Sequence, residues 1–295
     1  MTAEPGSSAP GLVVVDKPAG MTSHDVVARV RRLAGTRKVG HAGTLDPMAT
    51  GVLVVGVNRA TRLLGHLLLT DKAYDATIRL GVSTTTDDAD GDVVRTTPAD
   101  GVSEDRVRSG LAAMVGDIEQ VPSAVSAIKV DGRRAYDLVR AGEHVRLAAR
   151  PVRIDGIDVR SFRRAPGVVD VDVSVRCSSG TYVRAIARDL GAGLAVGGHL
   201  TALRRTAVGP FGLDVAHTLD DLAEDFTLLP IDVAARQSFP SVDLSGEQAA
   251  DVRVGRKIVL PLEGAGPHAV FAPEGDFLAL YEAAGEQARA VAVFV

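Results

Sequence analysis

The segment that decides the fold reads GHAGTLDPMATG at residues 40–51, and the apolar run VLVVGV follows it at residues 52–57. Three glycines loosen the backbone of the first segment, and Pro47 biases Asp46 toward an extended conformation that can point its carboxylate out of the loop. The apolar run is typical of a buried strand. Together they predict an irregular loop that carries one carboxylate and leads directly into the core.

Upstream of this loop the pattern indicates a strand, a turn and a helix. The short β-branched run at residues 12–15 is followed by the turn-rich DKPAG at residues 16–20. Ser23 is the expected N-cap of the next helix, and Gly35 is the expected stop. The valines of this helix share one side and its arginines fall on the other, so we expect a basic outer face.

Downstream segments alternate between strand and helix patterns. Residues 74–80 and 93–95 are expected strands on either side of an acidic loop, and residues 169–177 alternate strictly between apolar and polar, as in a half-buried strand. A helix is expected at residues 181–190, closed by Gly191. Because strands and helices interleave without regular βαβ spacing, the sequence predicts an α+β fold on a largely antiparallel mixed sheet.

The C-terminal stretch has the pattern of a separate small unit. A break is expected at residues 236–241, and Ser245 and Gln248 form a capping-box pattern at the start of a short helix. Three short strand candidates follow. They centre on Val270, Leu278 and Val291.

Length and composition agree with this division. With 295 residues, 46% of them hydrophobic, the chain can fold into one large domain at residues 11–236 and a small β-rich domain at residues 240–295. Residues 1–10 are polar, without a basic start or an apolar stretch, so we expect a disordered tail rather than a signal peptide. No segment has about 18 uninterrupted apolar residues, and the single cysteine, Cys177, rules out an internal disulfide; both features suit a cytoplasmic protein.

Charge is unevenly distributed along the chain. The net charge of −4 argues against a polyanionic partner, yet residues 29–38 hold five cations and no acid, and residues 127–164 hold ten cations against five acids. Acids concentrate at residues 84–119, nine against three cations, and at residues 214–232, six against none. A basic face with an acidic back would attract phosphates. The alternative is that these are ordinary solvated charges.

Several apparent metal and nucleotide motifs do not meet their structural requirements. Asp88, Asp90 and Asp92 have calcium-loop spacing, but Val93 stands where the sharp turn of that loop needs glycine. The glycines at residues 191–193 end a helix and lack the third glycine of a dinucleotide fingerprint. The seven histidines show no ligand pairing, so no metal site is expected.

Asp46 is a lone carboxylate among apolar neighbours in its loop. Burial there would raise its pKa and neutralise it unless a nearby cation keeps it ionised. The alternative is that Asp46 only bonds the backbone of a turn, as aspartate before proline often does. The residue pattern alone leaves both interpretations open.

Six motifs in the chain resemble those of one known family. Residues 41–51 resemble the signature loop of the bacterial tRNA pseudouridine-55 synthases, the TruB family, and residues 16–23 match the family's N-terminal motif. The further matches, all in the family's order, are residues 71–74, 126–129 before Gly132, 179–184 and 203–205. The resemblance covers roughly residues 11–210. The chain departs from the family pattern in two places. Val125 stands where many relatives have tyrosine, and the C-terminal region is only loosely similar to a PUA domain.

The resemblance implies a pseudouridine synthase catalytic domain with a PUA-like, RNA-binding C-terminal domain. It makes Asp46 the catalytic nucleophile, pairs Arg184 with it, and packs Tyr74 on the target base. Such an enzyme extrudes its base from the stack at a cost of a few kcal/mol, and aromatic stacking of about 1–3 kcal/mol per base can offset that cost.

The resemblance assigns three more residues to substrate binding. Tyr182 and Leu203 would be walls of the base pocket, and His41 would occupy the gap left in the RNA stack. The implied reaction isomerises the T-loop uridine of tRNA without gain or loss of atoms or electrons, so no cofactor is expected. The implied partner is the T-arm stem-loop, bound by a monomer that needs no other protein.

Two functions from other classes compete with this one. The first is an RNA-binding or RNA-folding protein whose carboxylate is idle. The second is a hydrolase that uses paired carboxylates on a glycosidic bond. The signature loop supplies only one acid, which disfavours the hydrolase.

Overall fold

The computed structural model describes residues 9–123, 129–130, 133–134, 147–285 and 287–295. Residues 1–8 of the predicted tail at 1–10 and the motif residues 125–128 lie outside the described residues. So do residues 131–132 and 135–146 of the predicted basic segment at 127–164. Two short strands within that segment, β8 (Lys129–Val130) and β9 (Arg133–Arg134), are described as backbone only.

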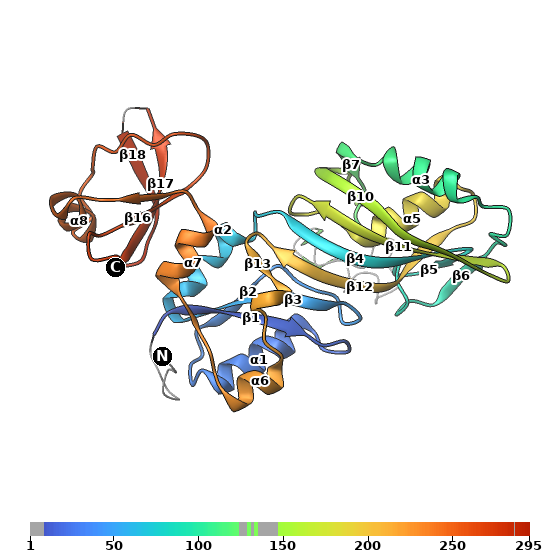
Figure 1. Cartoon of the computed structure of the whole chain (residues 1–295), viewed down its shortest axis with the longest axis horizontal. Helices are drawn as coiled ribbons and strands as arrows, with labels where there is room; N and C mark the ends of the chain where they lie inside the picture. The colour runs from blue at the N-terminus through green and yellow to red at the C-terminus, as the bar shows by residue number, and fades with distance from the viewer. Residues whose placement is uncertain (1–8, 124–128, 131–132, 135–146, 286) are drawn as a thin grey trace.

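One large sheet organises the main part of the molecule (Figure 1). Ten of the described strands belong to it, in the order β14-β1-β3-β12-β4-β11-β10-β7, with β2 paired to β3 and β13 to β12. Their bounds are β1 (Gly11–Lys17), β2 (Val39–Ala42), β3 (Thr50–Val57), β4 (Lys72–Leu80), β7 (Gly116–Gln120), β10 (Arg150–Ala165), β11 (Val168–Cys177), β12 (Gly198–Val208), β13 (Phe211–Gly212) and β14 (Leu229–Pro230). Within it the β12–β3 pairing is parallel and the others are antiparallel, which confirms the predicted largely antiparallel sheet.

The parallel contact is a narrow seam between two halves of the sheet. It consists of Arg204 opposite Thr50 and Arg205 opposite Gly51. Gly51 has φ +97°, and a Cβ on it would lie 2.1 Å from the carbonyl oxygen of Arg205, so only glycine allows this approach. The loop that carries Asp46 ends at this seam.

Helix α1 (Ser23–Leu33) begins one residue earlier than predicted. Its N-cap is Thr22, whose side chain accepts a hydrogen bond from the Asp25 backbone, and the Asp25 side chain accepts from the Thr22 backbone in return. The prediction of Ser23 as N-cap was therefore wrong, because the reciprocal capping box forms with Thr22. The Ser23 hydroxyl bonds a more distant loop instead.

Helix α5 (Val183–Gly193) corrects a second boundary. The helix was expected to begin at residue 181 and to be closed by Gly191, but it begins at Val183 and runs through Gly191. A Cβ on Gly191 would lie 2.2 Å from the carbonyl carbon of Gly197. This glycine therefore serves close packing of the helix against the next strand rather than a helix stop.

The remaining elements of the main part are short. The strands β5 (Val82–Thr84) and β6 (Val93–Thr96) form a separate two-stranded ribbon, with the acidic loop between them as predicted. The helices are η1 (Asn58–Arg62), α2 (Leu64–Leu67), α3 (Glu104–Ala112), η2 (Leu213–Val215), α6 (Leu219–Glu224) and α7 (Ile231–Ser238). Helix α7 is the last element before the C-terminal unit.

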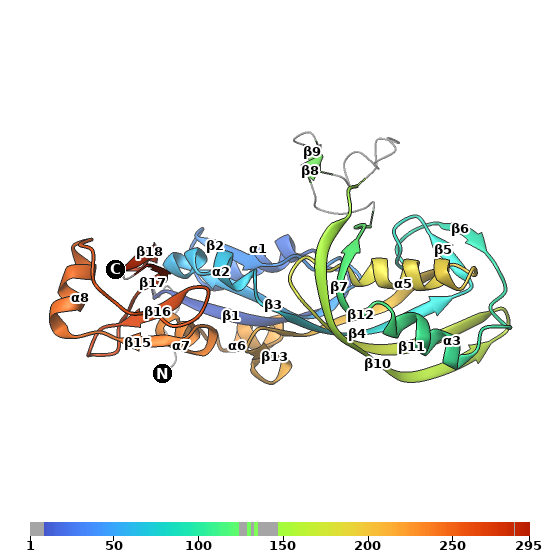
Figure 2. The same ribbon diagram turned by 90° about the horizontal axis from the view of Figure 1, so that it is seen from above.

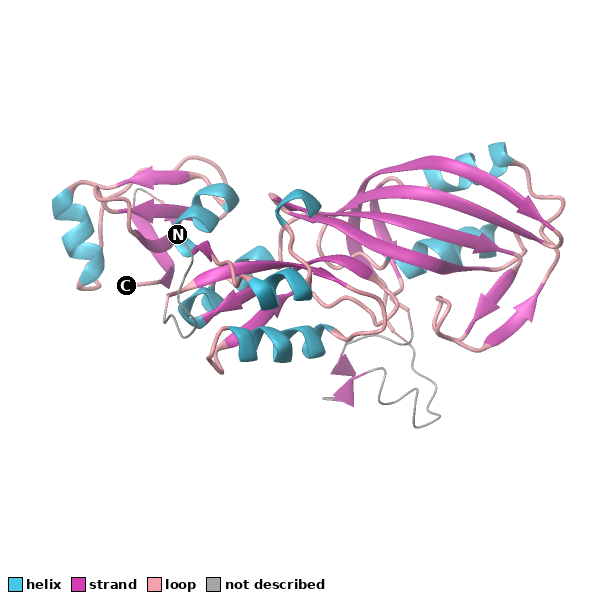
Figure 3. Cartoon of the chain, turned by 60° about the horizontal axis from the view of Figure 1, so that its bottom comes forward, coloured by secondary structure: helices cyan, strands magenta, loops and turns pink. Residues whose placement is uncertain are grey.

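Helices cover the sheet unevenly, as Figure 3 shows. In β11 every second side chain is buried beneath α5 and α3, which confirms the predicted half-buried strand. In β1, by contrast, Val13 and Val15 face one core while Leu12 and Val14 face another. Burial on both faces explains the unbroken apolar runs of β1 and β3.

The second core joins the main part to the C-terminal unit. This unit contains β15 (Ser241–Asp243), α8 (Gly246–Arg253), β16 (His268–Phe271), β17 (Phe277–Ala284) and β18 (Gln287–Val293). The capping box of Ser245 and the three predicted strands are confirmed, and β15 adds a short parallel strand that was not predicted. Phe271, Phe277 and Phe294 pack in one cluster with Leu12 and Val14 of β1.

No helix in the described part of the chain is long and apolar enough to cross a membrane.

Candidate active site

The loop between β2 and β3 carries Asp46 to the seam of the sheet. The Ser23 hydroxyl holds this loop on both sides of Leu45, donating to the Leu45 carbonyl at 3.1 Å and accepting from its amide at 2.9 Å. Leu45 and Ala49 are buried in the core on either side of the carboxylate. Asp46 is therefore presented by a segment whose neighbours are fixed.

A buried lysine holds the other side of the loop. Lys17 is fully buried at the end of β1, and its Nζ donates to the carbonyls of Pro18 at 2.9 Å, Met21 at 2.6 Å and Pro47 at 3.2 Å. Burial lowers the pKa of Lys17 to about 8, against the opposing attraction of Asp46. The Gly20 amide adds a 2.8 Å bond to the Pro47 carbonyl.

Arg184, in the first turn of α5, binds Asp46 through two hydrogen bonds. Its Nε lies 3.0 Å from Asp46 Oδ2 and its Nη2 lies 3.2 Å from Asp46 Oδ1. The side chain of Arg184 is 5% exposed and that of Asp46 is 34% exposed. A fork of this kind fixes the direction of a carboxylate as well as its charge, and leaves one side of Asp46 open to solvent.

The same guanidinium binds a second carboxylate. Its Nη1 lies 3.2 Å from Asp88 Oδ2, and donates to the Thr86 carbonyl at 2.8 Å. Asp88 is 5% exposed and also accepts hydrogen bonds from Thr86 Oγ1 and, at 3.1 Å, from the Asp90 amide. Asp88 is thus a structural anchor of the arginine, turned away from solvent.

The electrostatics of Asp46 balance opposing effects. Burial raises the pKa of the Asp46 carboxyl, the Arg184 guanidinium lowers it, and the charges of Asp88 and Asp90 raise it, with a net shift above the ordinary value. Arginine remains charged under these conditions, so it supports the ionised form.

One helical turn after Arg184, Arg188 forms an ion pair with Asp87, the residue before Asp88. Arg188 Nη1 lies 3.4 Å from Asp87 Oδ2, and its Nη2 donates to the Val121 carbonyl at 2.7 Å. Burial raises the pKa of Asp87. The acidic stretch 84–119, expected on the back of the molecule, therefore contributes Asp87 and Asp88 to the site, where two arginines spaced four residues apart face them.

The carboxylate of Asp88 was not expected at this site from the sequence. Its spacing with Asp90 and Asp92 suggested only a calcium loop, which Val93 disfavours. Within the described residues, no group of three or more His, Cys, Asp or Glu side chains is arranged to hold a metal ion. The available signal was the pairing of adjacent aspartates at 87 and 88 with arginines at 184 and 188, a spacing that places both cations on one face of a helix.

Tyr74 and Leu203 lie on neighbouring strands, β4 and β12, and both side chains belong to the main core. Tyr74 is 8% exposed, and burial raises its pKa. Its hydroxyl is hydrogen-bonded to Arg205, which also donates to the carbonyls of Val52 at 2.7 Å and Gly43 at 3.1 Å. Arg205 thus connects Tyr74 to both ends of the Asp46 loop.

Tyr182 precedes α5 and is half-buried. Its amide donates to Gln120 Oε1 at 2.8 Å, and its carbonyl accepts from Gln120 Nε2 at 3.2 Å. Gln120 is buried at the end of β7. The backbone two residues before Arg184 is therefore held by a side chain from the edge strand β7.

His41 lies on β2, five residues before Asp46, and its ring makes an edge contact with His24 at 5.6 Å between centroids. Burial lowers the pKa of His41, and the neighbouring His24 lowers it further, so the ring is neutral near pH 7. Of the six predicted residues, Arg184 is the one bonded directly to Asp46 by the contacts described, and His41 is half-buried on β2.

Cys177 plays no part in this arrangement. It is buried at the end of β11, and burial raises the pKa of its thiol to about 11. A protonated, buried thiol is inert.

Family models match almost the whole chain. The model of the TruB family pseudouridylate synthase N-terminal domain matches residues 31–183, that of the tRNA pseudouridylate synthase B C-terminal domain matches residues 184–265, and that of the tRNA pseudouridine synthase II C-terminal region matches residues 239–295.

Curated relatives are similar to this chain over almost its whole length. The chain is 60% identical over 284 residues to the tRNA pseudouridine synthase B of Mycobacterium sp. (strain KMS), covering 96% of this chain and 95% of that protein. It is 58% identical over 290 residues to the tRNA pseudouridine synthase B of Thermobifida fusca (strain YX), covering 97% and 99%.

Solved structures share the fold. A Cbf5-Nop10-Gar1 complex contains a chain that superposes with a TM-score of 0.75 at 26% identity, covering 97% of this chain and 85% of that one. An H/ACA RNP bound to a substrate RNA containing 2′-deoxyuridine gives a TM-score of 0.72 at 26% identity, with the same coverage. By fold this is a protein of the pseudouridine synthase class, a class of isomerases. Within that class, the chain belongs to the TruB family of pseudouridylate synthases.

Proposed function

We propose that this chain converts the T-loop uridine of tRNA, uridine-55, to pseudouridine, with Asp46 as its catalytic nucleophile. The observation that carries the proposal is the Asp46–Arg184 pair, in which a carboxylate is held by a two-point fork and still exposes one side. The full-length relatives named tRNA pseudouridine synthase B support tRNA as the substrate.

The proposed reaction is balanced without a cofactor. The bond between C1′ and N1 of the uridine breaks, the detached base rotates, and a bond between C1′ and C5 forms. C5 loses one proton and N1 gains one, so the product has the mass of the substrate. Attack on C1′, addition to C6 and removal of the C2′ proton are the routes open to Asp46, and each requires its ionised form.

We assign four neighbouring residues to base recognition and one, His41, to the RNA stack. Tyr74 would pack on the extruded base, with Tyr182 and Leu203 as walls of the pocket and Arg184 directing the carboxylate. His41, whose pKa is lowered by burial, would occupy the gap left by the extruded base. Stacking against aromatic rings would offset part of the cost of base extrusion.

The second carboxylate gives the hydrolase alternative little support. A glycosidase needs one carboxyl group as acid and another as base or nucleophile on the two sides of its bond. Asp88 is buried behind Arg184 and shares that guanidinium with Asp46. It therefore does not face the open side on which a sugar would bind.

RNA binding is proposed to depend on the basic stretches. Cations at residues 29–38 and 127–164 would contact phosphates, so affinity should fall as salt rises. The C-terminal unit holds eight acids against four cations at residues 240–295, so we expect it to add to RNA binding through shape more than through charge. We propose that the chain acts in the cytoplasm as a monomer without an obligate protein partner.

The test uses the purified chain and a T-arm stem-loop, with chelator present and no added cofactor. We expect pseudouridine in the digested RNA and an unchanged intact mass. A hydrolase would release free uracil and lower the mass, and an RNA-binding protein with an idle carboxylate would do neither. Replacement of the target uridine by cytidine in the same stem-loop is the control, and conversion elsewhere in that RNA would contradict the assigned position.

A further inference from the structure

Two arginines of α5 bind three consecutive residues of the acidic loop between β5 and β6. Arg184 binds the first and the third, because its Nη1 donates to the Thr86 carbonyl at 2.8 Å and lies 3.2 Å from Asp88 Oδ2. Arg188, one helical turn later, binds the middle residue, with its Nη1 3.4 Å from Asp87 Oδ2. The loop is therefore fixed to the helix at two successive turns.

Asp87 has an unusual backbone conformation. Its φ is +61°, in the left-handed region that residues with a side chain rarely adopt and that aspartate tolerates better than most. The Leu200 amide donates to the Asp87 carbonyl at 3.0 Å, and Asp88 forms a parallel bridge with Leu200. This conformation lets two successive carboxylates reach arginines four positions apart on one helix. Backbone strain of this kind is concentrated at functional sites.

Arg188 also binds the end of β7. Its Nη2 donates at 2.7 Å to the carbonyl of Val121, the residue after Gln120. The Gln120 side chain makes both of its described hydrogen bonds to the backbone of Tyr182. Figure 2 shows α5 between β7 and the β5–β6 ribbon. One side chain thus joins the strand that supports Tyr182 to the loop that binds Arg184.

We propose that Arg188 and Asp87 are positioning residues for the catalytic carboxylate, an inference that rests on the proposed function. Neither is bonded to Asp46 by the contacts described. Arg188 holds Asp87 on α5 and thereby fixes the next residue, Asp88. The carboxylate of Asp88 in turn shares the guanidinium of Arg184 with Asp46. The Asp87–Arg188 latch therefore acts through Arg184 and sets the direction of the fork that holds the nucleophile.

The setting of the latch suits a geometric role. The side chain of Asp87 is 14% exposed and that of Arg188 is 28% exposed. Burial raises the pKa of Asp87, and the Arg188 guanidinium opposes that shift. A pair that is largely removed from water gives little net stability, because desolvation offsets the attraction between its charges. Its directed hydrogen bonds nevertheless hold the loop in a single position on the helix.

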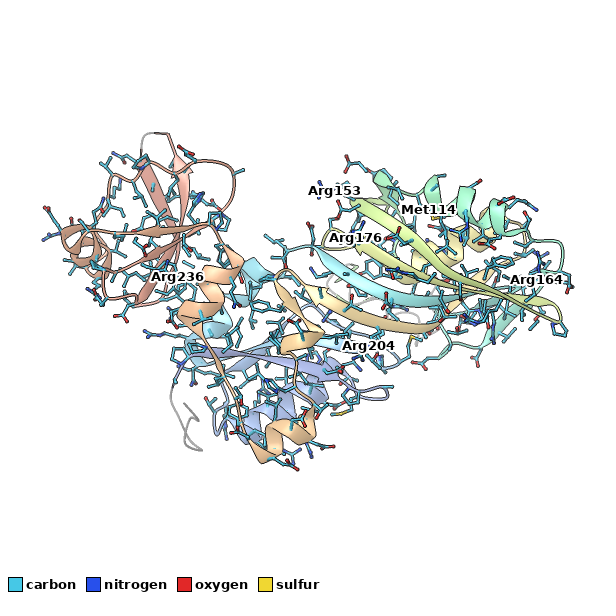
Figure 4. All side chains as sticks on the ribbon, in the orientation of Figure 1. Met114, Arg153, Arg164, Arg176, Arg204 and Arg236 are labelled. Carbon is cyan, nitrogen blue, oxygen red and sulfur yellow. The ribbon has the colours of Figure 1, made fainter. Side chains whose placement is uncertain are left out.

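The test substitutes the latch and a matched ion pair elsewhere. Asp87→Asn removes the charge and keeps the backbone, since asparagine also tolerates a positive φ. Arg188→Gln removes the cation. The control is Asp170→Asn, which breaks a 2.7 Å pair with Arg79 between β11 and β4. Asp170 lies on the same face of β11 as Arg176, which Figure 4 labels, and this face is opposite the valines that pack in the main core.

Single-turnover rates with enzyme in excess measure positioning, and dissociation constants for the stem-loop measure binding. We expect each latch variant to be about tenfold slower with unchanged RNA affinity. The double variant should also be about tenfold slower, because the two residues act as one unit. In an Arg184→Lys background, Asp87→Asn should slow the reaction less than about twofold, since the fork it positions is already lost. Asp170→Asn should keep the rate of the unsubstituted chain.

Urea unfolding provides a readout that does not depend on activity. The combined loss of stability from Asp87→Asn and Arg184→Lys should be smaller than the sum of the separate losses, whereas the losses from Asp170→Asn and Arg184→Lys should add. Additive losses for the latch would overturn the proposal. So would an unchanged rate in both latch variants, or an undiminished rate effect in the Arg184→Lys background. An unsubstituted chain that forms no pseudouridine would reject the proposed function, and the unfolding comparison would still decide whether the latch is coupled to Arg184.

Discussion

Asp46 and Asp88 bind the same guanidinium, that of Arg184, with contacts of 3.0 Å from Nε to Asp46 and 3.2 Å from Nη1 to Asp88. One carboxylate is partly open to solvent and the other is buried. Because they share a cation, each affects the charge state of the other, and substitutions at Arg184 and Asp88 should shift the pKa of Asp46 in opposite directions.

Asp46→Asn should fold and bind RNA but form no pseudouridine. The amide keeps the shape of the carboxylate and can still accept a hydrogen bond from Arg184, but it has lost the charge and the nucleophilicity. Single-turnover assays with enzyme in excess measure this directly. Pseudouridine formation above the rate without enzyme would remove Asp46 from its catalytic role.

Arg184→Ala should slow the single-turnover rate roughly 100-fold, because the carboxylate loses its direction. It should also move the acidic limb of the pH profile to higher pH. The guanidinium lowers the pKa of Asp46 while burial and Asp88 raise it, so removal of the guanidinium raises that pKa further. Ionised Asp46 then requires a higher pH.

Arg184→Lys provides the comparison for this prediction. Lysine keeps the positive charge and loses the two-point fork, so the rate should fall less and the pH profile should shift less than in Arg184→Ala. If both variants kept the wild-type rate and profile, Arg184 would be a residue of the fold alone.

Asp88→Asn should shift the pH profile the other way. The charge of Asp88 raises the pKa of Asp46, so its removal lowers that pKa and extends activity to lower pH. Arg184 loses one charged anchor, and we expect a loss of about 1–3 kcal/mol in the free energy of unfolding. Rates across a pH series and urea unfolding measure the two effects, and a shift toward higher pH would contradict the assigned coupling.

The local pattern of the chain predicted most of its regular structure. Strict alternation identified β11, and the apolar run at 52–57 identified β3, because each pattern reports directly which faces are buried. The ends of α1 and α5 were wrong because capping and close packing depend on specific partners. Ser23 bonds Leu45, 22 positions away, while the adjacent Thr22 forms the cap. Gly191 packs against Gly197, and the residue pattern does not distinguish a glycine needed for close packing from one that ends a helix.

The candidate site divides in the same way. The Asp46 loop was apparent from its own residues, whereas the link to Arg184 came from the family resemblance, since the two residues lie 138 positions apart. Asp88 was missed because its acidic loop resembles a calcium loop in spacing, and its arginine partner is distant in the chain. The arrangement of the two halves of the sheet depends on the pairing of β3 with β12, two strands that lie far apart in the chain.

Lys17→Met should loosen the loop that carries Asp46. The carbonyls of Pro18, Met21 and Pro47 would lose their donor, at a cost of about 1–3 kcal/mol for each carbonyl that water does not reach. Part of this cost is offset because the cation no longer has to be desolvated. We expect lower stability near pH 7 and a lower single-turnover rate. Lys17→Arg is the control, because it keeps the positive charge at this position while the larger guanidinium changes the hydrogen-bond geometry.

The stability difference between the original chain and Lys17→Met should also depend on pH. The pKa of Lys17 is about 8 in the folded chain against 10.5 without burial. A lowered lysine pKa means that the folded state favours the neutral amine, so the original chain gains stability relative to the variant as pH rises from about 8 toward 10.5. The gain is at most about 1.4 kcal/mol per pH unit. A difference that stays flat across this range would show that Lys17 has an ordinary pKa.

Gly51→Ala should disrupt the seam that positions the whole site. Its φ of +97° is unfavourable for alanine, and the added Cβ would lie 2.1 Å from the backbone oxygen of Arg205, which no side-chain rotation can relieve. We expect a loss of more than about 3 kcal/mol in the free energy of unfolding, and a reduced single-turnover rate in the protein that still folds. Gly20→Ala is the matched control, because Gly20 also has a positive φ, +81°, but its Cβ would have no atom within 4 Å. That variant should lose only about 1–2 kcal/mol. Equal stability of the two variants in urea unfolding would mean that the contact of β3 with β12 is not what holds the Asp46 loop in place.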